Sequence, residues 1–193
     1  DVRLSLHPDQ FNVLASLNQG AVTRTVRELE FYSSFMTEIG CFEDSRSPIN
    51  IHMNCIGDSE EISKRFITSF NQLGPVLQKR LVLENDDKIN GWSTKKLYDY
   101  VYSKTGTPIT FDYLHHKCYS DNLSEEDAFH LAYSSWGEVT PLFHYSESIP
   151  GDKNPRKHAD RATKEPNSYN KSLDLDYEFK LKELSLIDSQ NAV

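Results

Sequence analysis

Histidine and carboxylate side chains recur along this chain, each at or just after a short apolar run. Glu84 stands out, because it ends the apolar run Leu81–Leu83 and is followed directly by Asn85, Asp86 and Asp87. Several carboxylates at the end of a buried strand are costly unless a positive charge lies beside them. Imidazoles and carboxylates without thiolates are ligands suited to Zn, Mn or Fe ions. The residue types therefore predict a site for divalent cations.

A carboxylate such as Glu84 can bridge two ions held about 4 Å apart, the arrangement that serves phosphodiester hydrolysis. One ion then activates a water for attack on phosphorus, and the other stabilises the leaving oxygen. The candidate ligands end six successive predicted strands: His7, His52, Glu84, Asp112 with His115, His144 and Glu178. A lone histidine at a strand end is more often structural, and residues 84–87 could also form a solvated turn. Repetition on six strands favours the metal site, whereas we interpret His116 and His130 as structural.

The elements that must position these ligands follow from hydrophobic patterning. Runs rich in β-branched and aromatic residues predict strands. These runs cover residues 1–7, 49–54, 80–86, 109–116, 139–146 and 173–180. Apolar spacing near 3.6 with start and stop signals predicts helices. These patterns cover residues 23–40, 59–75, 93–106 and 124–137. The amphipathic segment 177–190 is predicted to be a helix that closes a barrel.

The strand starts from residue 49 onward lie about thirty residues apart, the length of one strand–helix unit. Such repeats form either an open doubly wound sheet or a (β/α)8 TIM barrel. Polar residues at six successive strand ends favour the barrel, because its chemistry gathers at the C-terminal ends of many strands. A barrel of this type usually needs eight strands and roughly 250 residues. We therefore expect one domain, residues 1–193, that lacks the first two βα units of the barrel.

The composition limits the partners and the compartment. The formal net charge of −8 argues mildly against nucleic acid, but bound cations would reverse the local field, and Lys and Arg cluster in residues 153–164. Three cysteines without a CxxC pair indicate neither a disulfide framework nor a thiolate zinc site. No run of about eighteen apolar residues predicts a membrane span. We expect an intracellular protein of the cytoplasm or nucleoid, and a monomer.

Six ordered motifs together resemble the ultraviolet-damage endonuclease family, a branch of the endonuclease IV-like and xylose isomerase-like TIM barrels. The motifs are RLSLHPDQFNVLAS, GDSEEISKRF, KRLVLENDD, FDYLHH, PLFHYSES and KHAD, and they extend over nearly the whole chain. The resemblance implies incision of damaged duplex DNA immediately 5′ to cyclobutane pyrimidine dimers and (6-4) photoproducts, without ATP, and at abasic sites as well. It also implies two or three divalent ions, typically Mn2+, with Zn2+ as an alternative.

Carried over motif by motif, the resemblance implies a ligand set and two catalytic carboxylates, Glu84 and Glu178. It assigns His7 and His52 to a first ion, Glu84 as the bridge, Asp112, His144 and Glu178 to a second ion, and His115 with His158 to a third. Gln10 and Phe11 match a pair that the family inserts opposite the lesion. Without the motif, Phe11 would equally well be a loop residue covering the barrel rim.

The chain departs from the family pattern at a few positions. Leu142 occupies the position of a lysine that helps the metal site, and Asn54 and Cys55 replace the usual glycines. These changes, with the incomplete barrel, leave alternatives open. They are an abasic-site endonuclease or sugar isomerase on the same barrel, and a catalytically silent DNA-binding remnant. An isomerase has no use for Gln10 and Phe11, and a silent remnant should bind fewer than two ions.

Overall fold

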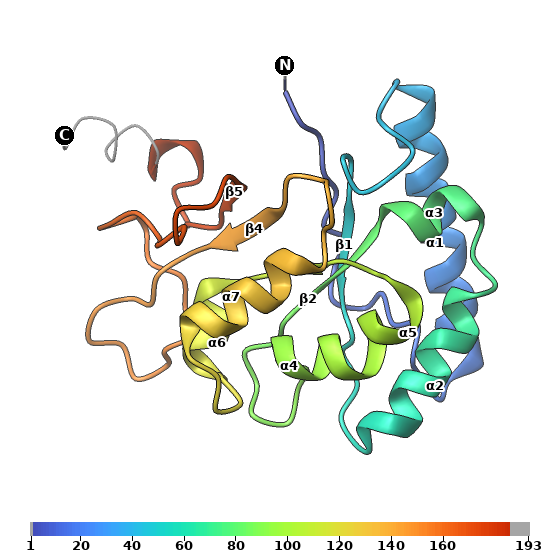
Figure 1. Ribbon diagram of the computed structural model, residues 1–193, viewed down its shortest axis with the longest axis horizontal. Coiled ribbons are helices and arrows are strands. Elements are labelled where there is room, and N and C mark those ends of the chain that lie inside the picture. The colour runs from blue at the N-terminus through green and yellow to red at the C-terminus, as the bar shows by residue number, and fades with distance from the viewer. Residues whose placement is uncertain (1, 186–193) are drawn as a thin grey trace.

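The computed structural model describes residues 2–185 and has the layered α/β architecture drawn in Figure 1. Its strands are β1 (Ile49–His52), β2 (Leu81–Glu84), β3 (Ile109–Thr110), β4 (Leu142–Tyr145) and β5 (Asp174–Tyr177). Its helices are α1 (Gln19–Glu38), α2 (Ser59–Phe70), α3 (Pro75–Arg80), α4 (Thr94–Leu97), α5 (Ser103–Thr105), α6 (Tyr113–Cys118) and α7 (Glu125–Ser134). A π-helical turn, η1 (Tyr98–Tyr102), joins α4 to α5.

All strand pairings between these elements are parallel. The strands pair in the orders β1–β2–β3 and β4–β5, and a parallel bridge between Asp112 and His144 connects the two groups. A further parallel bridge joins Leu6 to Ile49 of β1. Because every strand runs in the same direction, the C-terminal ends of all of them lie at one edge. Parallel strands alternating with helices agree with the βα units predicted from the sequence.

Local sequence signals set where the helices begin. Asn18, Asp58 and Ser124 cap α1, α2 and α7, and the side chain of each accepts a hydrogen bond from a backbone N–H of the first turn. Pro75 is the first residue of α3, where its missing N–H costs nothing. The starts of α2 and α7 agree with the predicted helices to within one residue, whereas α1 begins four residues before its predicted start at residue 23. The helix predicted over residues 59–75 ends at Phe70, and α3, which begins at the predicted stop Pro75, was not predicted.

Two strand predictions need correction. The strand predicted over residues 109–116 ends after Thr110, because the Asp112 side chain caps α6 and turns the chain into a helix at Tyr113. Of the strand predicted over residues 1–7, residues 2–7 form an extended segment that pairs with β1 at Leu6 (Figure 1). The helix predicted over residues 177–190 lies partly outside the described residues; Tyr177 ends β5, residues 178–182 form a loop, and residues 183–185 are helical.

The hydrophobic core lies between the sheet and the surrounding helices. Ile49, Ile51, Leu81 and Leu83 are buried on the strands, and Phe66 of α2 packs in the same cluster. β5 differs from the other strands, since Asp174 and Asp176 are exposed and alternate with half-buried residues. This pattern is that of an edge strand with one face in solvent.

The N-terminal segment also contacts the strands at the other side of the sheet. The Arg3 guanidinium donates to the carbonyl of Thr140 at 2.7 Å and to the Asp174 carboxylate at 2.8 Å. Arg3 therefore connects the segment before β1 with the first residue of β5.

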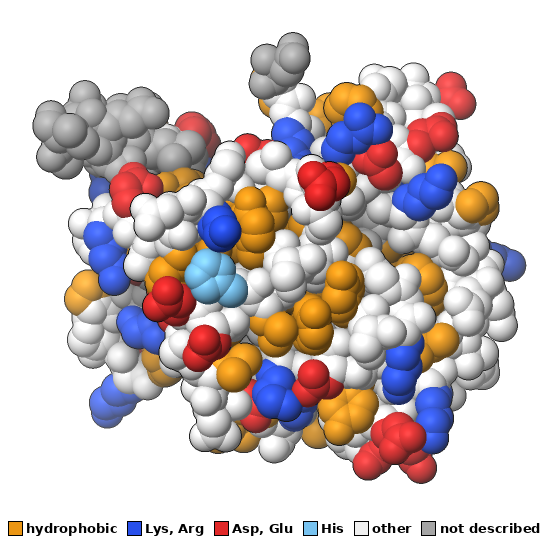
Figure 2. All heavy atoms as spheres, in the orientation of Figure 1, with side chains coloured by type: hydrophobic (Ala, Val, Ile, Leu, Met, Phe, Trp, Pro, Cys, Tyr) orange, Lys and Arg blue, Asp and Glu red, His pale blue; other side chains and the backbone are white. Residues whose placement is uncertain are grey.

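The molecular surface carries both signs of charge. On the face in Figure 2, acidic and basic side chains are interspersed with hydrophobic ones. Among residues 2–185, no helix combines the length and the apolar character needed to span a bilayer.

Candidate metal centre

The predicted ligands come from the C-terminal ends of the parallel strands. His52 and Glu84 are the last residues of β1 and β2 and are direct partners in the strand register. Side chains alternate between the two faces of a strand, so paired residues on neighbouring parallel strands point the same way. His144 of β4 faces the same interior and pairs with Asp176, two residues before Glu178. The strand register thus brings these side chains to one centre.

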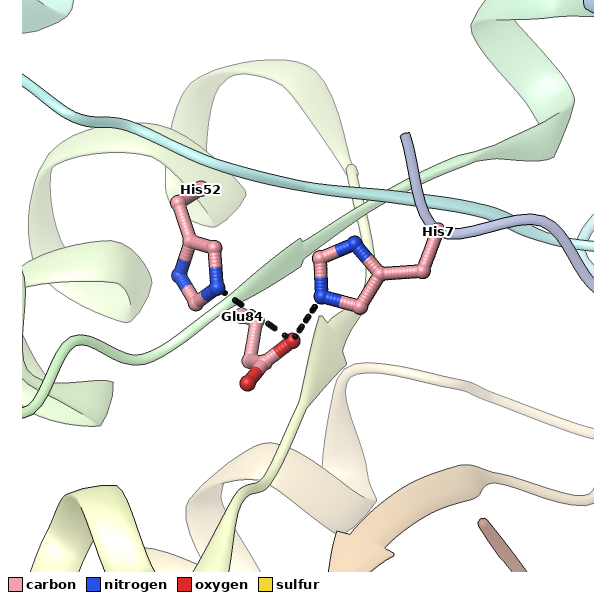
Figure 3. A group of neighbouring side chains, drawn as sticks. All are labelled: His7, His52 and Glu84. Carbon is pink, nitrogen blue, oxygen red and sulfur yellow. Dashed lines mark ion pairs between the residues drawn. The ribbon is translucent and has the colours of Figure 1, made fainter. Parts of the chain in front are cut away.

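Glu84 lies at the middle of this centre and has no exposed side-chain surface. Figure 3 shows His7 and His52 pointing at its carboxylate from the N-terminal segment and from β1. Its Oε2 lies 3.1 Å from His7 Nε2, 3.7 Å from His52 Nε2 and 3.1 Å from His144 Nδ1. Its Oε1 lies 3.1 Å from His115 Nδ1. Four imidazoles therefore surround one buried carboxylate.

The charges of this centre are strongly coupled. Burial alone would raise the pKa of Glu84, but the nearby imidazoles of His52, His144 and His115 hold it well below its ordinary value. Burial would lower the pKa of His115, yet the carboxylates of Asp112 and Glu84 raise it well above 6.5. The pKa of His144 is likewise well above 6.5, because Glu84 and Glu178 outweigh its burial. The carboxylates of the centre are therefore stabilised by positive charge, which either protons on the imidazoles or bound cations can supply.

The pKa values of the other two carboxylates differ in direction. Burial and the neighbouring carboxylates Glu84 and Glu178 raise the pKa of Asp112, although His115 opposes them. Burial would raise the pKa of Glu178 as well, but His144 lowers it by more. Its Oε1 lies 3.2 Å from His144 Nδ1.

The arrangement of the buried polar atoms fits divalent cations. Glu84 Oε1, Asp112 Oδ2 and His144 Nδ1 are buried and have no hydrogen-bond partner within the described part of the chain. His144 Nδ1 nevertheless lies 3.1 Å and 3.2 Å from two carboxylates, so these atoms are close without being aimed at one another. Ligand atoms that converge on a common ion have this geometry. The nitrogen and oxygen donors are also the types that Zn and Mn ions accept.

Seven of the eight predicted ligands fall into three overlapping groups, in each of which the ligand atoms lie within 4.8 Å of one another. The groups are His7–His52–Glu84, His7–His144–Glu178 and Glu84–Asp112–His115. His7 and Glu84 each belong to two groups, so either could lie between two ions. The resemblance had implied that Asp112 shares an ion with His144 and Glu178. In the structure, Asp112 instead falls into a group with His115 and Glu84. The assignment of ligands to individual ions stays a prediction.

His158 lies beside the centre but belongs to none of these three groups within residues 2–185. Its Nδ1 contacts the backbone carbonyl of Glu178, and an antiparallel bridge joins it to Ser148. Its role as a ligand stays a prediction. Leu142, at the family's lysine position, is buried on β4 two residues before His144.

Gln10 and Phe11 lie in the loop after His7. The Phe11 side chain is 76% exposed, and its backbone N–H donates to Asp9 Oδ1 at 2.8 Å. The amide of Asn54 donates to the Gln10 carbonyl at 2.8 Å and ties this loop to the loop after β1. The pair is accessible, and its role in probing a lesion stays a prediction.

Three residues that contact the ligands were missed at the level of sequence. Asn50 of β1 donates its amide to Glu84 Oε2, and its position two residues before His52 could have indicated this, because both face the interior. Asn85 bonds the backbone of Asp112 at two points. Asp86 Oδ1 lies 3.1 Å from His52 Nδ1, within ion-pair distance, whereas the other ring nitrogen of His52 faces Glu84.

The loop after β2 holds Asp86 in place. The backbone N–H of Trp92 donates to Asp86 Oδ2 at 2.8 Å, and the Trp92 carbonyl accepts from the Asp86 N–H at 2.8 Å. A Cβ on Gly91 would lie 2.7 Å from the Asp86 Cβ, closer than such atoms approach in proteins. Glycine at this position therefore allows the loop to close around the Asp86 side chain.

Comparison with known proteins agrees with this fold. The sequence profile of the family described as UV-endonuclease UvdE matches residues 1–191. A UV DNA damage endonuclease of a Nostoc species is 29% identical over 194 residues, covering 96% of this chain and 57% of that protein. One of Clostridium perfringens is 28% identical over 151 residues, covering 76% of this chain and 35% of that protein. The chain thus spans about a third to three fifths of the length of these curated relatives.

The structural neighbours support the same relationship. The crystal structure of SacUVDE matches with a TM-score of 0.83 and 31% identity, covering all of this chain and 67% of the other. Endonuclease IV of Thermus thermophilus matches with a TM-score of 0.64 at 14% identity, a likeness of fold alone. The chain has the β/α fold of the TIM-barrel proteins, with five strands among the described residues, and belongs to the UV-endonuclease UvdE family.

Proposed function

We propose that this chain is a metal-dependent DNA-repair endonuclease that incises damaged duplex DNA 5′ to pyrimidine dimers and (6-4) photoproducts. The observation that carries the proposal is the convergence of four imidazoles on the fully buried Glu84 carboxylate, within three overlapping groups of ligands. The curated relatives named UV DNA damage endonucleases support the substrate class. Because that substrate is genomic DNA, we also propose an intracellular location. We further propose that the protein acts as a monomer.

Two or three divalent ions, Mn2+ in this proposal, would supply Lewis acidity and a water acidic enough to lose its proton near neutral pH. The residues of the three groups would hold them, with His158 as an additional ligand. Hydrolysis forms a bond between the water oxygen and phosphorus while the bond from phosphorus to the 3′ oxygen breaks, and that oxygen takes up a proton. Glu84 would fix the ion positions, since it is inaccessible to solvent. Glu178, with a side chain 26% exposed, would accept the proton of the attacking water.

The loop of Gln10 and Phe11 would provide the choice of lesion. An apolar wedge can replace stacking that is lost when a damaged dinucleotide leaves the helix, and a photodimer is already poorly stacked. The exposed Phe11 ring and the fixed backbone of this loop suit that role. Lesion choice would then depend on the deformability of the duplex rather than on base sequence.

The test is incision of a duplex with one defined pyrimidine dimer, compared with an undamaged duplex and one with an abasic site. Each is assayed with Mn2+ and with a chelator. We expect a single cut 5′ to the dimer that depends on Mn2+ and is lost in Glu84→Gln. Glu126→Gln, the same exchange at an exposed position of α7, serves as the matched control and should cut normally. Equal cutting of the damaged and undamaged duplexes would refute damage recognition, and bound Mn2+ without any cutting would favour a silent remnant.

A further inference from the structure

The position of Asp112 is not fixed by strand pairing in the usual way. β3 contains two residues, and its register with β2 ends at the pair Glu84 and Thr110. Asp112 lies beyond that point, where the chain leaves the strand and α6 begins. On the side of β2, another contact must therefore hold the Asp112 backbone at the sheet.

The side chain of Asn85 provides this contact. Its Oδ1 accepts a hydrogen bond from the Asp112 N–H at 2.8 Å, and its Nδ2 donates to the Asp112 carbonyl at 3.1 Å. Both residues are buried, with 1% and 0% of their surfaces exposed. A side-chain amide has the same donor and acceptor as a peptide group. Asn85 thus continues the pairing between β2 and β3 by one further step.

The backbone of Asn85 acts on a second ligand. Its carbonyl lies 2.8 Å from His115 Nδ1, and because a carbonyl only accepts, Nδ1 donates. The lone pair of a neutral His115 ring is then on Nε2. Asp112 Oδ1 in turn accepts from the His115 N–H at 2.6 Å, which leaves Asp112 Oδ2 buried without a partner among the described residues.

We propose that Asn85 is a positioning residue for one ion, the one held by Glu84, Asp112 and His115. The proposal rests on the metal centre of the proposed function and adds a residue that is itself not a ligand. Outer residues that orient metal ligands typically change metal affinity about 10- to 100-fold when they are replaced.

The experiment is titration of the purified protein with Mn2+ alone, followed by calorimetry and by metal analysis of the gel-filtered complex. In Asn85→Ala, the backbone carbonyl that faces His115 remains and only the contacts to Asp112 are lost. We expect one ion to bind about 10- to 100-fold more weakly than in the wild type, with the others unchanged. Asn85→Asp keeps the acceptor for the Asp112 N–H but loses the donor, and the same single ion should weaken.

Ser135→Ala is the matched control. Its buried hydroxyl accepts from the Ile109 N–H at 2.8 Å, at the opposite end of β3 from Asp112. Loss of this bond should lower stability without changing the number or affinity of the ions. Unchanged Mn2+ binding in both Asn85 variants would overturn the proposal, and so would weakening of the same ion in Ser135→Ala.

Hydrogen exchange of the Asp112 amide, measured without metal, separates this proposal from the metal centre. We expect slow exchange in the wild type and in Ser135→Ala, and faster exchange in Asn85→Ala. A wild type that binds no Mn2+ would refute the metal centre of the proposed function. Rapid exchange of the Asp112 amide in the wild type would by itself refute the contact with Asn85, even if neither Asn85 variant folds.

Discussion

Replacement of the buried carboxylate in Glu84→Gln tests the central role of this residue. Glutamine keeps the shape of the side chain and removes one negative charge that lies 3.1 to 3.7 Å from four imidazole nitrogens. One unit charge pair about 4 Å apart contributes about 4 kcal/mol at an effective dielectric constant near 20. Because Mn2+ carries two charges, loss of this carboxylate should weaken Mn2+ binding by at least about a thousandfold.

The same variant should change stability in opposite directions at low and high pH when metal is chelated. The raised pKa values of His115 and His144 mean that their pairing stabilises the fold fully below 6.5 and is lost as pH rises through the folded values. The lowered pKa of Glu84 gives stability that is present above 4.5 and lost as pH falls through its folded value. Between about pH 4.5 and 6.5 both contributions are present, so Glu84→Gln should be less stable than the wild type.

At an alkaline pH above the raised folded pKa values of His115 and His144, the histidines have lost their protons and the chelated wild type keeps a buried carboxylate without positive partners. Glu84→Gln should then be the more stable protein, and saturating Mn2+ should restore the advantage of the wild type. Urea unfolding at the two pH values, with chelator and with Mn2+, measures both effects. Mn2+ affinity within threefold of the wild type, or a stability difference of the same sign at both pH values, would refute the reasoning.

Three other substitutions test separate parts of the structure. Asp86→Asn should weaken Mn2+ binding about 10- to 100-fold in calorimetry, because His52 loses the carboxylate at its Nδ1. Asp87→Asn, which removes the same charge one residue away, should not. Phe11→Ala should weaken binding to a dimer-containing duplex in fluorescence anisotropy while stability stays within about 0.5 kcal/mol, since the ring is exposed. Loss of Mn2+ from this variant would contradict a separate probing role. Arg80→Met should cost about 3 to 5 kcal/mol in urea unfolding with Mn2+ binding intact, because the buried guanidinium donates to Ser33, Thr37, Cys41 and Phe42. A cost below 1 kcal/mol would contradict that account.

The sequence by itself determined the parts of this protein that depend on local pattern. The spacing of apolar runs predicted parallel βα units, and the position of His52, Glu84 and His144 at strand ends predicted that they meet at one edge. This prediction needs no detailed packing, because parallel strands in a barrel all end on the same side. A serine followed by acidic residues predicted helix starts at Ser59 and Ser124; Ser124 is the cap of α7, whereas the cap of α2 is Asp58, one residue before Ser59.

Only the tertiary structure decided which candidate ligands lie beside one another and what holds them. The aromatic run at residues 109–116 has strand propensity throughout, but the cap made by Asp112 ends the strand early and turns His115 toward Glu84. Asn85 and Asp86 follow Glu84 directly in the sequence. Asn85 nevertheless contacts Asp112, just after β3, and Asp86 contacts His52 of β1. These contacts join residues that are separated by 27 or 34 positions in the sequence. They depend on strand register and loop closure, which residue type and spacing along the chain do not encode.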